Sequence, residues 1–288
     1  MLLGLGLVTV GSVAHAVWNL LVKRSGTTGT PFVWLYSVLV TPALLSALLL
    51  RAQATGGLLF THWWAGVVSA FLHTSYALVL QRSYTSGELG VVYPVARAGA
   101  PVLVALGAVS LLHARPQPGL WLGLAVIAGG IALLIGGGSS SAPAAWRAAA
   151  AGGATALTIA GYTLWDGYAV SRLHVDVVTY LTVGSAAQLV ILSLVVAPQR
   201  DQVAAVARSH WRAALPIAGL VPLSYGLVLA ALHYVDVQVV AAARSISIVA
   251  AAALGWCLLD EPRVPRRLAG AILTTAGVAL TAFSGSTS

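Results

Sequence analysis

Long apolar runs separated by short polar breaks dominate the hydropathy pattern of this chain. Cutting it at charged residues and at Gly- and Pro-rich breaks leaves apolar segments close to the ~20 residues that a helix needs to cross a bilayer. The predicted segments are 2–22, 31–50, 62–81, 89–111, 118–136, 148–170, 177–197, 212–232, 237–259 and 266–284. The pattern therefore predicts an all-α membrane protein with ten transmembrane helices.

The composition indicates that lipid is the solvent for most of the surface. Of the 288 residues, 59% are hydrophobic and only 8% are charged, and the mean hydropathy is +0.91. A soluble domain carries roughly 25% charged residues, so this chain is not expected to be a cytosolic enzyme, a secreted domain or a disordered protein. No basic residue precedes Leu2, so the first segment is expected to be a retained helix rather than a cleavable signal peptide.

The basic residues carry information about topology. The net charge is +8, but Lys and Arg are spread between apolar runs without a nucleic-acid-binding motif, so no nucleic acid partner is expected. The loops after the first, third, fifth, seventh and ninth segments hold Lys23, Arg24, Arg82, Arg147, Arg200, Arg208, Arg212, Arg263, Arg266 and Arg267, and the other loops hold Arg51, Arg115 and Arg172. Because cytoplasmic loops are enriched in Lys and Arg, this count predicts that both termini lie outside the cytoplasm.

The two halves of the chain resemble each other. The matched pairs are 75–80 with 224–229, Trp18 with Trp165, Arg97 with Arg244, Gly123 with Gly270 and Gly130 with Gly277, in the same order and at offsets of 147 to 149 residues. These matches predict a duplication of residues 1–136 as 148–288, joined by a linker at 137–147. Because each repeat has five helices, the second must be inverted. Two inverted five-helix repeats are typical of secondary transporters that work by alternating access.

Three stretches resemble the EamA type of the drug/metabolite transporter superfamily. They are His-Ala-Val-Trp-Asn-Leu-Leu-Val-Lys at 15–23, Val-Tyr-Pro-Val-Ala-Arg at 92–97, and Leu-Leu-Asp-Glu-Pro at 258–262 with the glycine-containing segment that follows. The resemblance implies two EamA domains and the transport of small metabolites, commonly amino acids or related compounds, through a central cavity. It also implies cytoplasmic termini, opposite to the charge count. The acid that relatives often carry after the fourth helix is missing, because 113–115 reads His-Ala-Arg.

Ionisable residues within the predicted helices are the main candidates for function, because each costs about 2.5–3.5 kcal/mol at a helix centre on insertion scales. Arg97 and Arg244 are equivalent in the two repeats and could bind a carboxylate or phosphate through paired hydrogen bonds. Alternatively, they pair with Asp166 or with helix carbonyls and lock the bundle. Two arginines against one aspartate leave a positive surplus, which favours a role in binding.

A polar stripe in the first segment and several aromatic residues complete the predicted site. His15, Asn19 and Lys23 follow helical spacing. His15 either takes up a coupling proton or is a hydrogen-bonded histidine packed between helices. Lys23 is expected at the membrane interface. The predicted substrate-binding residues are Arg97, Arg244, Tyr93, Trp18, Asn19, Tyr76, Trp165, Asp166 and Tyr225, and the coupling-ion candidates are His15 and Asp166. Aromatic side chains with polar atoms suit a cavity that binds both apolar and polar parts of a substrate.

The leading hypothesis is a secondary transporter, expected to export amino acids or small organic anions across the cell membrane. The alternative is an exporter of lipophilic cations that uses Asp166. A membrane enzyme acting on a lipid-linked substrate is a weaker hypothesis, because the adjacent acids Asp260 and Glu261 have no histidine near them in sequence; a non-transporting scaffold protein is equally weak. No nucleotide-binding loop or metal-ligand spacing is present, so no cofactor is expected, and a monomer in the lipid bilayer could be the working unit.

Overall fold

The elements of the computed structural model are helices, which confirms the all-α class. The structure describes residues 1–27, 29–86, 89–113, 115, 117–135, 142–258 and 265–284. The helices are α1 (Leu2–Ser25), α2 (Thr30–Thr55), α3 (Trp64–Ser86), α4 (Leu89–Leu112), α5 (Pro118–Ile135), α6 (Ala142–Ser171), α7 (Val177–Val196), η1 (Ala197–Gln199), α8 (Arg200–Ala231), α9 (Val237–Ala243), α10 (Ile246–Leu258) and α11 (Pro265–Ser284).

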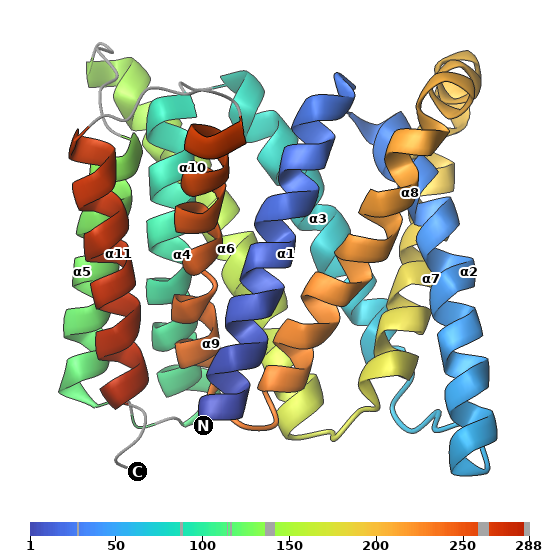
Figure 1. The fold of residues 1–288 in the computed structure, drawn as a ribbon, viewed down its shortest axis with the longest axis horizontal. Coiled ribbons are helices and arrows are strands. Elements are labelled where there is room, and N and C mark those ends of the chain that lie inside the picture. Colours follow the sequence, from blue (N-terminus) through green and yellow to red (C-terminus); the bar gives the residue numbers. More distant parts are fainter. Residues whose placement is uncertain are drawn as a thin grey trace.

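The long helices stand side by side and alternate in direction along the chain, with α9 and α10 following each other in the same direction (Figure 1). Helices α5 and α11 form one edge of the bundle, and α2 and α7 lie at the other. Between them, α1 packs against α8 and α10, while α6 packs against α3 and α4. The start of α1 and the end of α11 lie at the same end of the bundle, the lower end in Figure 1.

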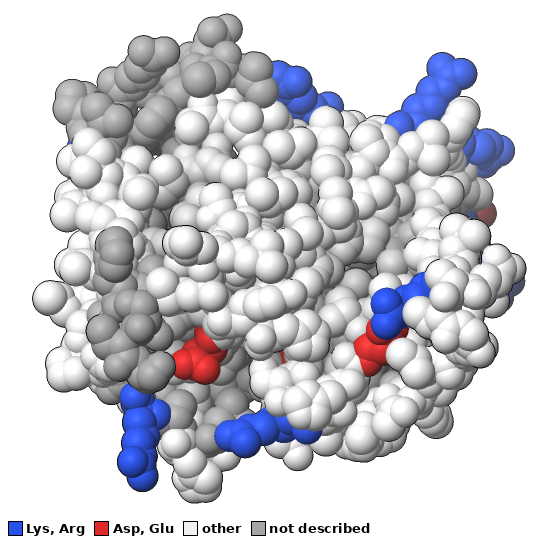
Figure 2. Space-filling view, turned by 60° about the horizontal axis from the view of Figure 1, so that its bottom comes forward, with Lys and Arg blue, Asp and Glu red and all other residues white. Residues whose placement is uncertain are grey.

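The distribution of apolar and polar side chains is that of helices surrounded by lipid. Large apolar side chains face outward, including Leu194 at 73% and Leu157 at 64% exposure, whereas Asp166 is 1% exposed. Residues 2–22, 30–55 and 177–231 form helical stretches that are long and apolar enough to cross a membrane, and five shorter apolar helices accompany them. In Figure 2, which brings the lower end forward, charged side chains lie mostly near the edges of the view and most of the surface is uncharged.

Glycines allow α5 and α11 to pack unusually closely. A Cβ atom at Gly123 would lie 2.8 Å from the carbonyl oxygen of Gly277, and one at Gly130 would lie 2.8 Å from that of Gly270. Any side chain at these positions would push the two backbones apart. The glycines that the sequence comparison paired as equivalents therefore meet across one antiparallel helix pair.

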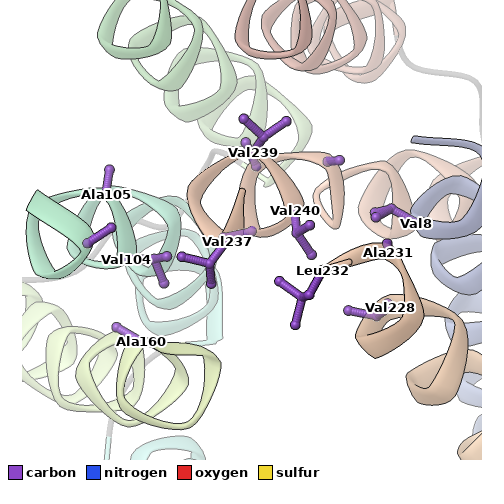
Figure 3. Close-up of a cluster of buried hydrophobic side chains, with 14 of the residues drawn as sticks. Val8, Val104, Ala105, Ala160, Val228, Ala231, Leu232, Val237, Val239 and Val240 are labelled. Carbon is purple, nitrogen blue, oxygen red and sulfur yellow. The ribbon is translucent and has the colours of Figure 1, made fainter. Parts of the chain in front are cut away.

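The predicted ninth helix, 237–259, is interrupted. Arg244 and Ser245 form a turn between α9 and α10. The Ser245 N–H donates to the carbonyl of Ala242 at 3.0 Å, and the Ser247 hydroxyl donates to the carbonyl of Arg244 at 2.7 Å. Serine hydroxyls compete with the backbone for such carbonyls and disturb regular helices. All seven residues of α9 are buried, and Figure 3 shows its Val237, Val239 and Val240 among side chains of the neighbouring helices.

Two helices begin earlier than predicted. Helix α8 begins at Arg200 rather than at 212, and α6 begins at Ala142, within the predicted linker. Charged residues such as Asp201 mark where an apolar run stops, but they do not end a helix. Helix α7 begins after Asp176, whose carboxylate accepts from the Thr179 N–H at 2.9 Å and also pairs with Arg51.

Candidate transport site

Two main cavities lie inside the bundle, one above the other along its axis. The lower cavity, of about 220 Å³, is lined by residues of α1, α2, α3, α6, α7 and α8 and by Arg244. The upper cavity, of about 320 Å³, is lined by residues of α1, α3, α4, α6 and α10, including Arg97. On α3, for example, Ser69 lines the lower cavity and Leu80 the upper one. The upper cavity lies at the lower end of the ~300–1,000 Å³ typical of small-molecule sites, and the lower cavity is smaller than that range.

Arg97 and Arg244 lie near each other as well as beside the main cavities. Both arginines line two small spaces, of about 30 and 10 Å³. His15 and Trp18 of α1 line both main cavities, and their rings meet edge to face at 4.9 Å. The two predicted arginines therefore lie at the centre of the bundle, each facing one of the main cavities.

Neutral aromatic groups surround Arg244. Its guanidinium carbon lies 5.8 Å from the ring centroid of Tyr162 and 5.6 Å from that of Tyr225, within the range of cation–π interactions. One of its nitrogens lies 3.5 Å from the Tyr162 hydroxyl. Among the described residues, no carboxylate lies within 4 Å of this guanidinium. The guanidinium of Arg244 is therefore stabilised by cation–π contacts with two tyrosine rings, and it can still bind an anion.

Asp166 is enclosed by four hydrogen-bonding side chains, two for each carboxylate oxygen. Ser69, at 2.8 Å, and Tyr180 donate to Oδ1, while Tyr225 and the Nε2 atom of His73, at 3.1 Å, contact Oδ2. A carboxylate offers about four acceptor positions, so these contacts use its full capacity. Asp166 does not appear among the described residues that line the cavities.

A stack of rings separates the Asp166 cluster from the upper cavity. His73 stacks on Tyr162 with ring centroids 4.1 Å apart, and the rings of Tyr76 and Tyr162 meet edge to face with centroids 5.4 Å apart. The Nε2 atom of His73 also lies 3.1 Å from the Tyr225 hydroxyl. Tyr162 therefore contacts Arg244 and His73 of the lower cavity and Tyr76 of the upper one.

Polar atoms without a partner gather in the same region. Within the described part of the chain, the buried Ser12 Oγ, Trp18 Nε1 and Thr163 Oγ1 have no hydrogen-bond partner. Thr163 lines the first of the small spaces, Ser12 lines the second, and Trp18 lines both main cavities. Buried polar groups normally have partners, so these atoms point to a polar ligand or water in this space.

Most of the predicted site residues line these cavities. They are Arg97, Arg244, Trp18, Asn19, Tyr76, Tyr225 and His15. Trp165 does not: among described residues it is absent from the cavity linings, and its Nε1–H donates to the carbonyl of Ala65 at 3.0 Å. The side chain of Tyr93 lies outside the described part of the structure, as do the side chain of Lys23 and the pair Asp260 and Glu261.

The sequence reasoning missed His73, Tyr162 and Tyr180. Two of them carry a signal that was present in the sequence: Ser69, His73 and Tyr76 follow helical spacing, as do Tyr162 and Asp166. Tyr180 contacts Asp166 only through the packing of α7, which no local spacing predicts. No group of three His, Cys, Asp or Glu side chains in the described ranges could hold a metal ion.

Apolar helices around a polar interior with two arginines are typical of a multi-pass membrane protein. Residues 147–283 match the model of the EamA-like transporter family. The second half of the chain therefore matches the EamA-type transporters of the drug/metabolite transporter superfamily, as the stretch at 258–262 and the segment after it predict. An EamA domain in residues 1–136 stays a prediction.

The fold also occurs in solved structures. One crystal structure, 15% identical in sequence, matches 97% of this chain and 98% of that chain with a TM-score of 0.73. At this identity the likeness concerns the fold alone, but it extends over nearly the whole length. No protein with a curated description matches the chain.

Proposed function

We propose that the protein is a secondary transporter that exports small carboxylate-bearing metabolites, amino acids or organic acids, across the cell membrane by alternating access. Arg97 and Arg244 bind the carboxylate, and the aromatic residues of the cavities bind the rest of the substrate. The observation that carries the proposal is the pair of cavities that share His15 and Trp18 and each contain one of the two arginines. The unit that works is a monomer, with neither enzymatic activity nor a cofactor.

Helix contacts support the inverted repeat on which alternating access depends. If α1 to α5 correspond to α6, α7, α8, α9 with α10, and α11, then the contact of α1 with α8 corresponds to that of α6 with α3. Likewise α1 on α10 corresponds to α6 on α4, and the pairs α2–α7 and α5–α11 map onto themselves. Both cavities are lined by helices of both repeats, so a relative movement of the repeats would reshape both. Exchange of the two repeats' conformations would open them in turn.

The charges favour an anion over the lipophilic cation considered as the alternative. A cation would need Asp166, whose two oxygens already accept from Ser69, Tyr180, Tyr225 and His73. An anion would meet Arg244 without breaking an existing ion pair. Binding the anion replaces a lost hydration shell with charge-assisted hydrogen bonds from the guanidinium.

Transport by the purified protein in liposomes tests the proposal. Counterflow of radiolabelled carboxylates is measured for the wild type, for Arg97→Gln and Arg244→Gln, and for the matched control Arg172→Gln, which changes an exposed arginine beyond α6. We expect the wild type and the control to transport and both cavity variants to lose at least tenfold in rate. If no carboxylate moves, or if both cavity variants transport normally, the proposal is wrong.

The single cysteine allows a direct test of access. After Cys257→Ser, a new cysteine is placed in the lower cavity as Ser185→Cys or in the upper cavity as Asn19→Cys. A membrane-impermeant thiol reagent is then applied from each side of oriented vesicles. We expect the two cysteines to react from opposite sides, and a transported carboxylate to change the two rates in opposite directions. Labelling of both from one side only contradicts alternating access.

A further inference from the structure

The described cavities contain no acidic side chain. The seven acidic residues of the chain are Glu88, Asp260 and Glu261, which lie outside the described residues, Asp176, Asp201 and Asp236 at the beginnings of α7, α8 and α9, and the enclosed Asp166. A substrate carboxylate bound to Arg244 therefore has a positive partner. An ammonium group on the same substrate has no negative partner among the residues described around the cavities.

The positive charges around Arg244 also repel an ammonium group on the substrate. In an α-amino acid the ammonium is attached to the carbon next to the carboxylate, so it would approach the guanidinium as the carboxylate binds. The faces of Tyr162 and Tyr225, which could otherwise hold a cation, already lie against that guanidinium. Arg97 lines the same small spaces as Arg244 and adds a second positive charge. Like charges at short distance inside a protein repel strongly.

The lower cavity offers an apolar surface to the remainder of the substrate. Away from Arg244 its lining includes Val40, Leu44, Leu181, Val221 and Pro222. The rings of Tyr36 and Trp18 also face it. An apolar or aromatic group of a small metabolite would lose contact with water here and gain contact with these side chains.

We infer that the lower cavity selects monocarboxylates with an apolar or aromatic body and no ammonium group, and discriminates against the corresponding amino acids. The inference rests on the proposed function and narrows its substrate class. Asp166 is not a ligand in this site. It orients Tyr225, whose hydroxyl it binds and whose ring supports Arg244.

Three probes with one phenylethyl body test the inference: 3-phenylpropanoate, L-phenylalanine and 2-phenylethylamine. Their dissociation constants are measured with the full-length protein in detergent by thermal shift and titration calorimetry. We expect 3-phenylpropanoate to bind at least tenfold more tightly than L-phenylalanine, and 2-phenylethylamine not to bind. In Arg244→Gln, and to a lesser degree in Arg244→Lys, the affinity for 3-phenylpropanoate should fall, whereas Arg172→Gln should leave it unchanged.

The outcomes separate this inference from the proposed function. If L-phenylalanine binds as tightly as 3-phenylpropanoate and both need Arg244, the inference is wrong and a carboxylate transporter remains. If 2-phenylethylamine binds best and is unaffected by Arg244→Gln, both are wrong and the cation hypothesis gains support. If none of the three binds to the wild type, the inference is wrong. The comparison among ligands uses the wild type alone, so it holds even if a variant fails to fold.

Discussion

Replacing Asp166 with asparagine tests whether the enclosed carboxylate holds four helices together. The side chain lies in α6 and accepts from α3, α7 and α8. An amide keeps one oxygen, which can accept two hydrogen bonds, but its NH₂ group only donates. Whichever way the amide turns, two of the four donors face that NH₂ group. They are either Ser69 and Tyr180 or His73 and Tyr225.

The expected loss follows from those two contacts. A hydrogen bond to a charged group contributes about 1.5–3 kcal/mol, so losing two costs about 3–6 kcal/mol. Hydroxyl groups can turn to accept from the amide, which places the value near the lower end, about 3 kcal/mol. At roughly 2–4 °C per kcal/mol, the Tm should fall by about 6–12 °C.

The assay is thermal unfolding of the detergent-purified protein, followed by tryptophan fluorescence. Asp201→Asn is the matched control, because Asp201 is exposed in the first turn of α8. There the loss is limited to a favourable contact with the helix dipole, about 0.3–1 kcal/mol. If Asp166→Asn unfolds within about 2 °C of the wild type, the carboxylate does not stabilise the bundle in the way its contacts indicate.

Three further pairs of substitutions have clear expectations. Gly277→Ala should lower the Tm, because its Cβ would lie 2.7 Å from a backbone nitrogen of α5. A Cβ at Gly129 would meet nothing within 4 Å, so Gly129→Ala should raise the free energy of unfolding by up to ~1 kcal/mol. Equal changes in Tm would contradict the close packing of α5 and α11. Asp176→Ala removes the N-cap of α7 and should lower the free energy of unfolding by about 1 kcal/mol. Arg51→Gln should lower it less, because it removes only the partly exposed ion pair with Asp176. The denaturation midpoints of the two variants test this order. Tyr162→Leu should weaken carboxylate binding at least tenfold and Tyr162→Phe much less, because the ring rather than the hydroxyl supports Arg244. Titration calorimetry measures both affinities, and equal losses in the two variants would show that the hydroxyl matters more than the ring.

The helices were predictable because lipid leaves the chain few choices. A segment that crosses a bilayer must be apolar, long enough to span it, and hydrogen-bonded within its own backbone. In the sequence, such segments are visible as apolar runs between charged residues. The boundaries of α8 were not predictable in this way, since the polar residues from Arg200 onward continue the same helix beyond the apolar run. The turn at Arg244 was also missed, because it depends on hydrogen bonds of Ser245 and Ser247 rather than on glycine or proline.

The candidate site was predictable to the extent that it repeats. Duplication identified Arg97 with Arg244 and Tyr76 with Tyr225, and all four line the cavities. The same argument fails for Trp165. Trp18 lines both main cavities, but the Nε1–H of its counterpart donates to the carbonyl of Ala65. Contacts between elements distant in sequence decide such differences, and no spacing within one helix reveals them.

The two arginines differ in how firmly the backbone holds them, and this difference leads to a last prediction. Arg97 lies inside the continuous helix α4, whereas Arg244 lies in the turn between α9 and α10. Across that turn, the N–H groups of Ser245, Ser247 and Ile248 donate to carbonyls three residues earlier. Such bonds have poorer geometry than those of an α-helix. Rotation about the turn would move Arg244 between the lower cavity and the small spaces that Arg97 also lines.

We therefore expect the backbone amides of 245–248 to exchange with deuterium faster than those of 97–100 in α4, when exchange is followed by mass spectrometry without ligand. Addition of 3-phenylpropanoate should slow the exchange at 245–248 more than at 97–100, because the bound carboxylate holds Arg244 in one position. The α4 segment is a fair control, since both segments lie within the bundle and each begins at or directly after one of the two arginines. Equal protection of the two segments would show that the turn is as rigid as the helix, and that both arginines act as fixed ligands.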